Sequence, residues 1–491
     1  MSDMSASQHD SEKAHSSEIA NDPVPEDPDI VDFEKPEDPE NPMNWSSGKK
    51  TTQIIIVTSM TLLSPIGSTI SAAATLDILE NFNSTNQTVG TLVTTIFLIG
   101  YTFGPIVIAP LSELYGRAIL YKVCIFFFVV FNVACAVSDS LRSLVTYRFL
   151  AGVMGSCPVT LSTGSIADMV IAEKRAGAMG AYIIGAVLGP AIGPVIGGYL
   201  TPAAGWRWTF WTMAIASGVM TVVSILFVHE SYPYVLLERK AQRLRKETGN
   251  LRLRSTLDTG RMPSSLFVFS ITRPLKMLLS PIVFLLSLYA AIVYSYLYLC
   301  FTTFEIVFYG QYGFSSGEAG LATLGIGIGS VLGCVVCGIA ANAVSKYLTG
   351  KHGGDPKPEY RLPPMILGGL CTPIGLFWYG WSAQARLHWI VPILGTVFIG
   401  MGMVFTYMPS AMYLVDAYTV HAASVTAAST IFRCLLGALL PLAGPAMYDT
   451  LGLGWGNSLL GFISIAFFPV PFILYLYGER LRNAKVFKVE I

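Results

Sequence analysis

The chain has 491 residues and no formal net charge, and 53% of its residues are hydrophobic while only 13% are charged. Soluble proteins carry about 25% charged residues, so this composition excludes an ordinary soluble protein and indicates a polytopic membrane protein. The first 48 residues hold 13 acidic and two basic side chains, which leaves a net charge of +11 on the remainder. Since this acid-, serine- and proline-rich tail has few large apolar residues, we predict a disordered segment over residues 1–48.

Twelve apolar segments follow the tail. Each has about the 20 residues that a helix needs to cross a bilayer, and none shows the alternation typical of a membrane barrel strand. We therefore expect an all-α polytopic membrane protein with twelve transmembrane helices, surrounded by lipid. The predicted spans are residues 51–73, 89–111, 119–138, 144–168, 177–200, 207–228, 281–304, 317–340, 364–384, 388–411, 421–447 and 456–477.

The Lys and Arg residues predict the orientation of these spans. They gather before span 1 and after spans 2, 4, 6, 8 and 12, and such enrichment is typical of cytoplasmic loops. Both termini are then cytoplasmic. The expected organisation is an acidic tail (1–48), a first six-helix bundle (49–228), a basic central loop (229–280), a second six-helix bundle (281–478) and a basic tail (479–491).

Two short segments outside the spans carry recognisable patterns. The loop after span 1 contains two N-glycosylation acceptor patterns, at Asn83 and Asn86, on the predicted outer side. In the central loop, residues 233–249 predict a basic amphipathic helix that begins at Pro233 and ends at Gly249. This helix would lie along the inner leaflet or form a solvated linker.

Small residues form a stripe along span 5. Glycines recur there every four residues, and a second row of prolines and glycine lies beside them, so one helix face has almost no side chains. A similar stripe occurs in span 8. Since small faces allow close packing of membrane helices, we predict that these two helices meet across an interface. The first row is Gly185, Gly189, Gly193 and Gly197, the second is Pro190, Pro194 and Gly198, and the span 8 stripe is Gly325, Gly329 and Gly333.

Several motifs resemble those of the major facilitator superfamily. The turn between spans 2 and 3 reads from Gly104 through Glu113 to Gly116 and Arg117, and span 4 contains Arg148 in an arginine motif. The Gly- and Pro-rich stretch of span 5 is similar to the motif of proton-driven exporters. Further motifs resemble fungal twelve-span drug:proton antiporters that export polyamines, drugs or secondary metabolites. The resemblance implies two six-helix bundles around a central cavity, with one bundle rocking against the other.

The resemblance also implies roles for charged residues near or inside the membrane. It would pair Arg117 with Asp168 and place Glu113 at the start of span 11, which together form an inner gate. It would give Arg148 a part in proton coupling, although an arginine hydrogen-bonded to helix carbonyls is the structural alternative. Glu305, in span 7, is the acid that would carry the exchanged proton if burial favoured its neutral form.

Span 7 predicts the chemistry of the cavity wall. Tyr294, Tyr298, Phe301 and Glu305 are spaced by four, three and four residues and therefore share one helix face. By the family resemblance this face lines the cavity. Aromatic rings with one carboxylate favour a flat or cationic substrate. Tyrosines at a membrane interface are the alternative interpretation.

Together these features predict a proton-coupled exporter of small organic compounds, with protons and the substrate as its partners, that functions as a monomer. The plasma membrane is the expected location and the vacuolar membrane the alternative. A nutrient importer of the same fold and a transporter-like receptor are rival interpretations. We expect no enzyme, cofactor, metal or nucleic-acid partner, because the six histidines form no cluster and the chain has no phosphate-binding loop.

Overall fold

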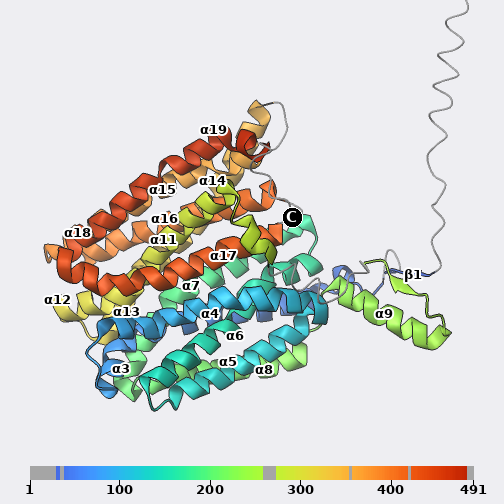
Figure 1. Ribbon diagram of the computed structural model, residues 1–491, viewed down its shortest axis with the longest axis horizontal. Coiled ribbons are helices and arrows are strands. Elements are labelled where there is room, and N and C mark those ends of the chain that lie inside the picture. The colour runs from blue at the N-terminus through green and yellow to red at the C-terminus, as the bar shows by residue number, and fades with distance from the viewer. Residues whose placement is uncertain (1–28, 34–37, 258–271, 353–356, 419–421, 484–491) are drawn as a thin grey trace, which may run out of the picture.

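The computed structural model describes residues 29–33, 38–257, 272–352, 357–418 and 422–483. It consists almost entirely of long helices that lie side by side in two groups, one from each half of the chain (Figure 1). The first group comprises α2 (Ser47–Thr69), η2 (Ala72–Ala74), α3 (Thr75–Asn81), α4 (Gln87–Tyr115), α5 (Arg117–Ala136), α6 (Leu141–Met169), α7 (Ala172–Ala204) and α8 (Arg207–Phe227).

The second group comprises α11 (Pro281–Phe304), the π-helical segment η3 (Glu305–Tyr309), α12 (Gly310–Tyr312), α13 (Ser316–Ala322), α14 (Leu324–Lys351), η4 (Pro358–Arg361), α15 (Pro363–Gln384), α16 (Ile390–Ala417), α17 (Ala422–Leu439), η6 (Leu440–Ala443), α18 (Gly444–Phe467) and α19 (Pro469–Asn483). Among the described residues, eleven helical stretches are long and apolar enough to cross a membrane, and the last of them, Ser424–Arg482, has 59 residues and covers α17 to α19. Since 59 residues are enough for two crossings, the twelve predicted spans are accounted for.

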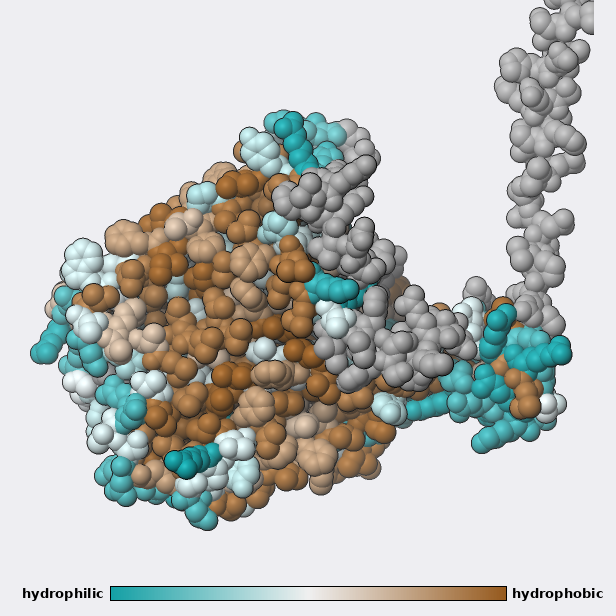
Figure 2. Space-filling view, in the orientation of Figure 1, coloured by the Kyte–Doolittle hydropathy of each residue, from teal (hydrophilic) through white to brown (hydrophobic). Residues whose placement is uncertain are grey.

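The surface agrees with a membrane location. Hydrophobic residues cover most of the helical body, while hydrophilic residues gather at its two ends and on α9 (Figure 2). Large apolar side chains point outward along α8, among them Ile215, Val219 and Leu226, which are 58%, 58% and 64% exposed. Such a continuous apolar surface would be a liability in water and is what lipid contact requires.

The boundary between spans 11 and 12 differs from the prediction. Span 11 was expected to reach residue 447, but α17 ends at Leu439, a 3₁₀ turn follows, and α18 already begins at Gly444. Pro441 and Pro445 explain the early end, because a proline has no N–H to continue the helix. The expected loop at 448–455 is helical, and only Gly452, with φ of 72°, departs from helical geometry there.

The acidic tail is wrongly predicted as wholly disordered. Its described part forms strand β1 (Ile30–Val31) and the 3₁₀ helix η1 (Pro42–Asn44), and β1 pairs in parallel with β2 (Arg254–Ser255) of the central loop. Lys240 Nζ lies 2.8 Å from Asp38 Oδ2, and both side chains are nearly buried. The tail therefore folds against the basic loop, because its acidic side chains find cations there.

Lys240 belongs to α9 (Pro233–Thr248), the predicted basic helix. It begins at Pro233 as expected, and Gly249, with φ of 72°, ends it in the left-handed conformation that glycine accommodates. Figure 1 shows α9 projecting beyond the ends of the spanning helices, next to β1.

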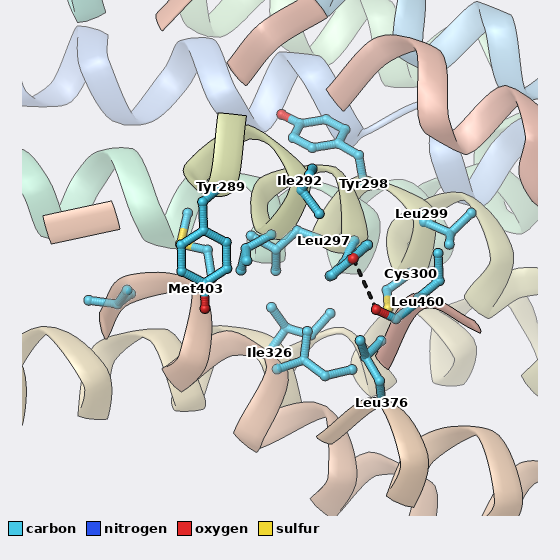
Figure 3. Packing of buried hydrophobic residues seen from close by; sticks show 14 of the residues in the cluster. Tyr289, Ile292, Leu297, Tyr298, Leu299, Cys300, Ile326, Leu376, Met403 and Leu460 are labelled. Atoms are coloured by element: carbon cyan, nitrogen blue, oxygen red, sulfur yellow. Dashed lines mark hydrogen bonds between the residues drawn. The ribbon is translucent and has the colours of Figure 1, made fainter. Parts of the chain in front are cut away.

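Helix α11 forms the centre of the second bundle. Its side chains pack against Ile326 of α14, Leu376 of α15, Met403 of α16 and Leu460 of α18 (Figure 3). The Tyr296 hydroxyl donates to the Leu460 carbonyl at 3.0 Å, which satisfies a polar group inside this apolar cluster. In Figure 3 the ring of Tyr298 lies on the other side of α11 from Met403 and Leu376. One side of α11 therefore holds the bundle together while another faces the opposite half of the molecule.

The helices of spans 5 and 8 meet, as predicted, but their glycine stripes do not pack against each other. The stripe of α7 faces α2 in its own bundle: a Cβ atom at Gly189 would lie 2.8 Å from Pro65 Cβ and 2.9 Å from the Leu62 carbonyl oxygen. The stripe of α14 faces α16, where a Cβ atom at Gly333 would lie 3.1 Å from Val404 Cβ. The spacing correctly predicts close packing, but it carries no information about which helix is the partner.

The bundles do meet along α7, through its other small face. Gly198 lies against Ser316, Pro194 lies against Gly320, and the Thr323 hydroxyl donates to the Ala191 carbonyl at 2.9 Å. These contacts join α7 to α13 and the start of α14, at the end of the molecule opposite α9. The second row of small residues, rather than the first, therefore makes the interface between the halves.

Candidate functional site

A cavity lies between the two bundles. It encloses about 840 Å³, a volume that includes space open to solvent, and helices of both halves line it. Its lining consists of Pro65, Ser68, Tyr101, Val159, Tyr182, Ile183, Ala186, Val187 and Pro190 from the first bundle, and of Tyr294, Leu297, Tyr298, Phe301, Ile326, Ser330, Met403, Tyr407 and Arg433 from the second. A concave, mostly apolar site with a few polar groups is typical of small-molecule binding.

Helix α11 supplies the aromatic wall. The rings of Tyr294 and Tyr298 have centroids 5.3 Å apart, and Phe301 follows at 5.8 Å from Tyr298. These three residues lie in the cavity lining, on the face that the four-and-three spacing indicates. The Tyr298 hydroxyl also lies 2.9 Å from Ser68 Oγ of α2, so one hydrogen bond joins the two bundles at the cavity wall.

Glu305 is not among the described residues that line the cavity, so its predicted place in the wall is wrong. The α-helical repeat of α11 ends at Phe304, and Glu305 opens a π-helical segment whose hydrogen bonds span five residues. The spacing rule of an α-helix therefore no longer holds at this position. The Glu305 side chain is buried, with 8% of its surface exposed, and Asp77 is a charged neighbour.

The charged residue of the cavity is Arg433 of α17, which the sequence places near the middle of span 11 without indicating what it contacts. Its guanidinium carbon lies 4.9 Å from the ring centroid of Tyr294 and 4.6 Å from that of Tyr407. The residue is 9% exposed, and its Nε has no hydrogen-bond partner within the described chain. An arginine in the middle of a membrane span is costly and usually placed for function.

Arg148 of α6 has a different environment. It is completely buried and donates to the carbonyl oxygens of Gly67, Ser68 and Val93 at 2.7, 3.0 and 3.0 Å. Among the residues whose side chains are described, no carboxylate forms an ion pair with it. These hydrogen bonds hold α2 and α4 against α6. One of the acceptors, the Ser68 carbonyl, belongs to the residue whose hydroxyl contacts Tyr298.

An ion pair closes the turn between α4 and α5. Arg117 Nε lies 2.5 Å from Asp168 Oδ2 at the end of α6, and both side chains are about 85% buried. The Glu230 carboxylate accepts from the backbone N–H groups of Arg117 and Ala118 at 2.9 and 3.1 Å. An acid is favourable there because the helix N-terminus carries partial positive charge.

Glu113 has a less defined place in this cluster. Its side chain is exposed, and its cationic neighbours are Arg117 and Arg273, which precedes α11. The expected contact with the start of span 11 involves residues 419–421, which lie outside the described residues. The Arg117 guanidinium lies over the Tyr232 ring, with 4.9 Å between guanidinium carbon and ring centroid. The pKa of Tyr232 is raised, mainly by burial and to a smaller extent by the nearby Glu113 carboxylate.

The second bundle contains a counterpart of the first ion pair, which sequence analysis did not find. Arg361 Nε, just before α15, lies 3.1 Å from Asp416 Oδ2 at the end of α16. Arg117 and Asp168 occupy the equivalent places at the start of α5 and the end of α6. The longer turn after span 8 hides this correspondence, because no motif around Arg361 repeats the one around Arg117.

Both glycosylation patterns lie in the loop before α4, at the end opposite α9. Asn83 is exposed and has a φ of 51°, which asparagine tolerates better than most residues. Asn86 is exposed too, but its Oδ1 accepts from the backbone N–H groups of Thr88 and Val89 at 3.0 and 3.4 Å. Asn86 is thus the N-cap of α4. Of the two asparagines, only Asn83 has a side chain that does not cap a helix.

Two six-helix groups around a cavity of this kind define a membrane transporter. The sequence profile of the Major Facilitator Superfamily matches residues 57–441. The chain is 52% identical to the MFS-type transporter penM of Penicillium rubens, over 94% of this chain and 91% of that protein. It is 45% identical to the efflux pump radE of Floropilus chiversii, over 95% and 87% of the two chains.

A solved structure of similar fold is the xylose transporter XylE from E. coli in a partially occluded inward open conformation. It has a TM-score of 0.64 and 17% identity, and the match covers 88% of this chain and 98% of that chain. The chain therefore belongs to the major facilitator superfamily. It is a multi-pass membrane protein and a transporter rather than an enzyme, and its similar relatives are fungal.

Proposed function

We propose that the protein exports a small organic metabolite across a fungal surface membrane in exchange for protons. The observation that carries this proposal is the cavity of about 840 Å³ between the bundles, with its tyrosines and aliphatic side chains. A lining with many rings and few fixed polar groups suits a bulky, partly apolar molecule better than a sugar, which needs many directed hydrogen bonds. The relative printed as an efflux pump, 45% identical, supports the outward direction.

Transport would follow from rocking of the two bundles about the cavity. The contacts of α7 with α13 and α14 close one end, opposite α9. At the other end, the pairs Arg117–Asp168 and Arg361–Asp416 would strengthen closure when the cavity faces outward. The excess of basic residues at the α9 end supports a cytoplasmic location for that end.

Proton coupling requires an acid that is protonated in one state and ionised in the other. Glu305 is our candidate, because it is a buried carboxylate beside a second acid, Asp77, and opens the π-helical segment next to the cavity wall. Such π-helical insertions often mark functional sites. Arg148 would contribute indirectly, by fixing the Ser68 backbone whose side chain meets Tyr298.

An efflux assay tests the direction of transport. Yeast cells that lack their own broad exporters would produce the chain, be preloaded with labelled aromatic metabolites, polyamines or azoles, and be followed for loss of label. We expect faster loss of at least one compound class than in cells with an empty vector. Faster uptake instead would support the nutrient importer, and unchanged flux with saturable binding would support the receptor.

A further inference from the structure

We infer that the exported compound is an aromatic monoanion, and that Arg433 is the residue that binds its acidic group. The inference rests on the proposed function and names the substrate class of the same cavity. It keeps the expectation of a flat substrate and reverses that of a cationic one, which rested on the aromatic rings and on Glu305 in the wall.

The charge of the cavity points to an anion. Arg433 is the only charged residue among the described residues of the lining. A cation in a mostly apolar, partly dehydrated site is unfavourable without an opposite charge, and the described chain provides no carboxylate within ion-pair distance of it. A ligand that brings one negative charge would neutralise the site, whereas a cationic ligand would double the positive charge.

The hydrogen-bonding groups point the same way. Arg433 Nε is buried and has no acceptor among the residues that the structure describes, and buried polar groups are rarely left unpaired. The guanidinium carbon lies over the faces of the Tyr294 and Tyr407 rings, 4.9 and 4.6 Å from their centroids. Because these contacts use the faces of the guanidinium plane, the N–H groups at the edge of that plane can donate to a ligand. A planar carboxylate matches this edge, because a guanidinium group binds the two oxygens of a carboxylate in parallel.

The rest of the lining describes the body of the ligand. The hydroxyls of Ser68, Tyr182 and Ser330 already donate to backbone carbonyl oxygens, at 2.6, 3.2 and 3.4 Å, so toward a ligand their oxygens act as acceptors. Between them, Val187, Leu297, Ile326 and Met403 are apolar, and Phe301 adds a ring face. A flat apolar skeleton with one acidic edge and a few hydrogen-bond donors fits both kinds of surface.

A binding experiment with three matched probes tests the assignment. The full chain, in phosphatidylcholine nanodiscs, would be titrated with tritiated naphthalene-2-carboxylate, naphthalene-2-carboxamide and 2-naphthylmethylammonium, with empty nanodiscs as background. The variants are Arg433→Gln, Arg433→Lys and Arg433→Glu. Arg207→Gln is the control, since Arg207 also stacks on a ring, that of Trp206 at 4.3 Å, but is not part of the lining. A thermal unfolding curve of each variant checks folding.

We expect the carboxylate to bind at least about 10-fold more tightly than the other two probes. A hydrogen bond to a charged group contributes about 1.5–3 kcal/mol, so Arg433→Gln should weaken carboxylate binding roughly 10- to 100-fold and abolish the preference. Arg433→Lys should keep part of it, and Arg433→Glu should prefer the ammonium probe. Arg207→Gln should match the unaltered chain.

Equal binding of all three probes, no saturable binding of any, or an Arg433→Glu variant that still prefers the carboxylate would each overturn the inference. If Arg433→Gln does not fold, the probe preferences of Arg433→Lys and Arg433→Glu test the inference instead. Failure of the proposed function is a separate result. In that case the carboxylate still binds with the expected preference, but proteoliposomes that contain the protein do not move it across the membrane.

Discussion

The glycine stripe of α7 offers a prediction that the structure makes quantitative. A methyl group at Gly189 would lie 2.8 Å from Pro65 Cβ and 2.9 Å from the Leu62 carbonyl oxygen, closer than side chains pack. One turn earlier, a methyl group at Gly185 would find its nearest neighbours in α2 at 3.6 Å, which is ordinary contact. Gly189→Ala should therefore force α7 away from α2, while Gly185→Ala should not.

The size of the effect follows from this difference. Replacing glycine by alanine favours the helix by about 1 kcal/mol at either position, so that contribution cancels when the two variants are compared. Overpacking costs typically about 1–3 kcal/mol, which is the difference that we expect between their free energies of unfolding. Titration of each purified variant with SDS in mixed micelles, monitored by circular dichroism, measures its free energy of unfolding. Equal unfolding free energies for the two variants would refute this packing.

Three further predictions concern charged residues. Asp168→Asn leaves Arg117 without its partner, and we expect normal membrane insertion with about tenfold slower transport, in flux measurements on proteoliposomes. Asp38→Asn breaks a buried pair with Lys240, so hydrogen exchange over residues 29–44 should accelerate strongly, whereas the exposed Glu40 should tolerate Gln with little change. Glu305→Gln should flatten the pH dependence of transport and leave binding of the naphthalene carboxylate unchanged; a normal pH profile would exclude Glu305 as the proton carrier.

The fold could be predicted from the sequence because the bilayer limits the choices. Backbone groups in lipid must bond within their own helix, so apolar segments of about 20 residues could be assigned to helices with good boundaries. Among the ends that differ by more than a few residues are those of α14, which continues to Lys351 beyond the predicted residue 340, and of α17, which stops at Leu439, before two prolines inside an apolar run. The ordered tail was missed for another reason: its strand and its Asp38 gain stability only from partners about 200 residues away, and composition cannot reveal such contacts.

The site was predicted less completely. Helix periodicity correctly places Tyr294, Tyr298 and Phe301 on one face, but it fails at Glu305, where the helical repeat changes. Spacing also cannot say which neighbour a face meets, so the glycine stripes were assigned to the wrong partners. Arg433 stands beside rings from two other helices, α11 and α16, and only the folded arrangement brings them together.

The most direct test of the central claim is transport in inverted membrane vesicles that contain the protein, with a pH gradient imposed across the membrane. In these vesicles the cytoplasmic face points outward, so an exporter coupled to protons should accumulate its aromatic anion when the interior is acidic. An uncoupler that collapses the gradient should release the accumulated compound. Accumulation that survives the collapse, or movement only toward equal concentrations on both sides, would contradict proton-coupled export.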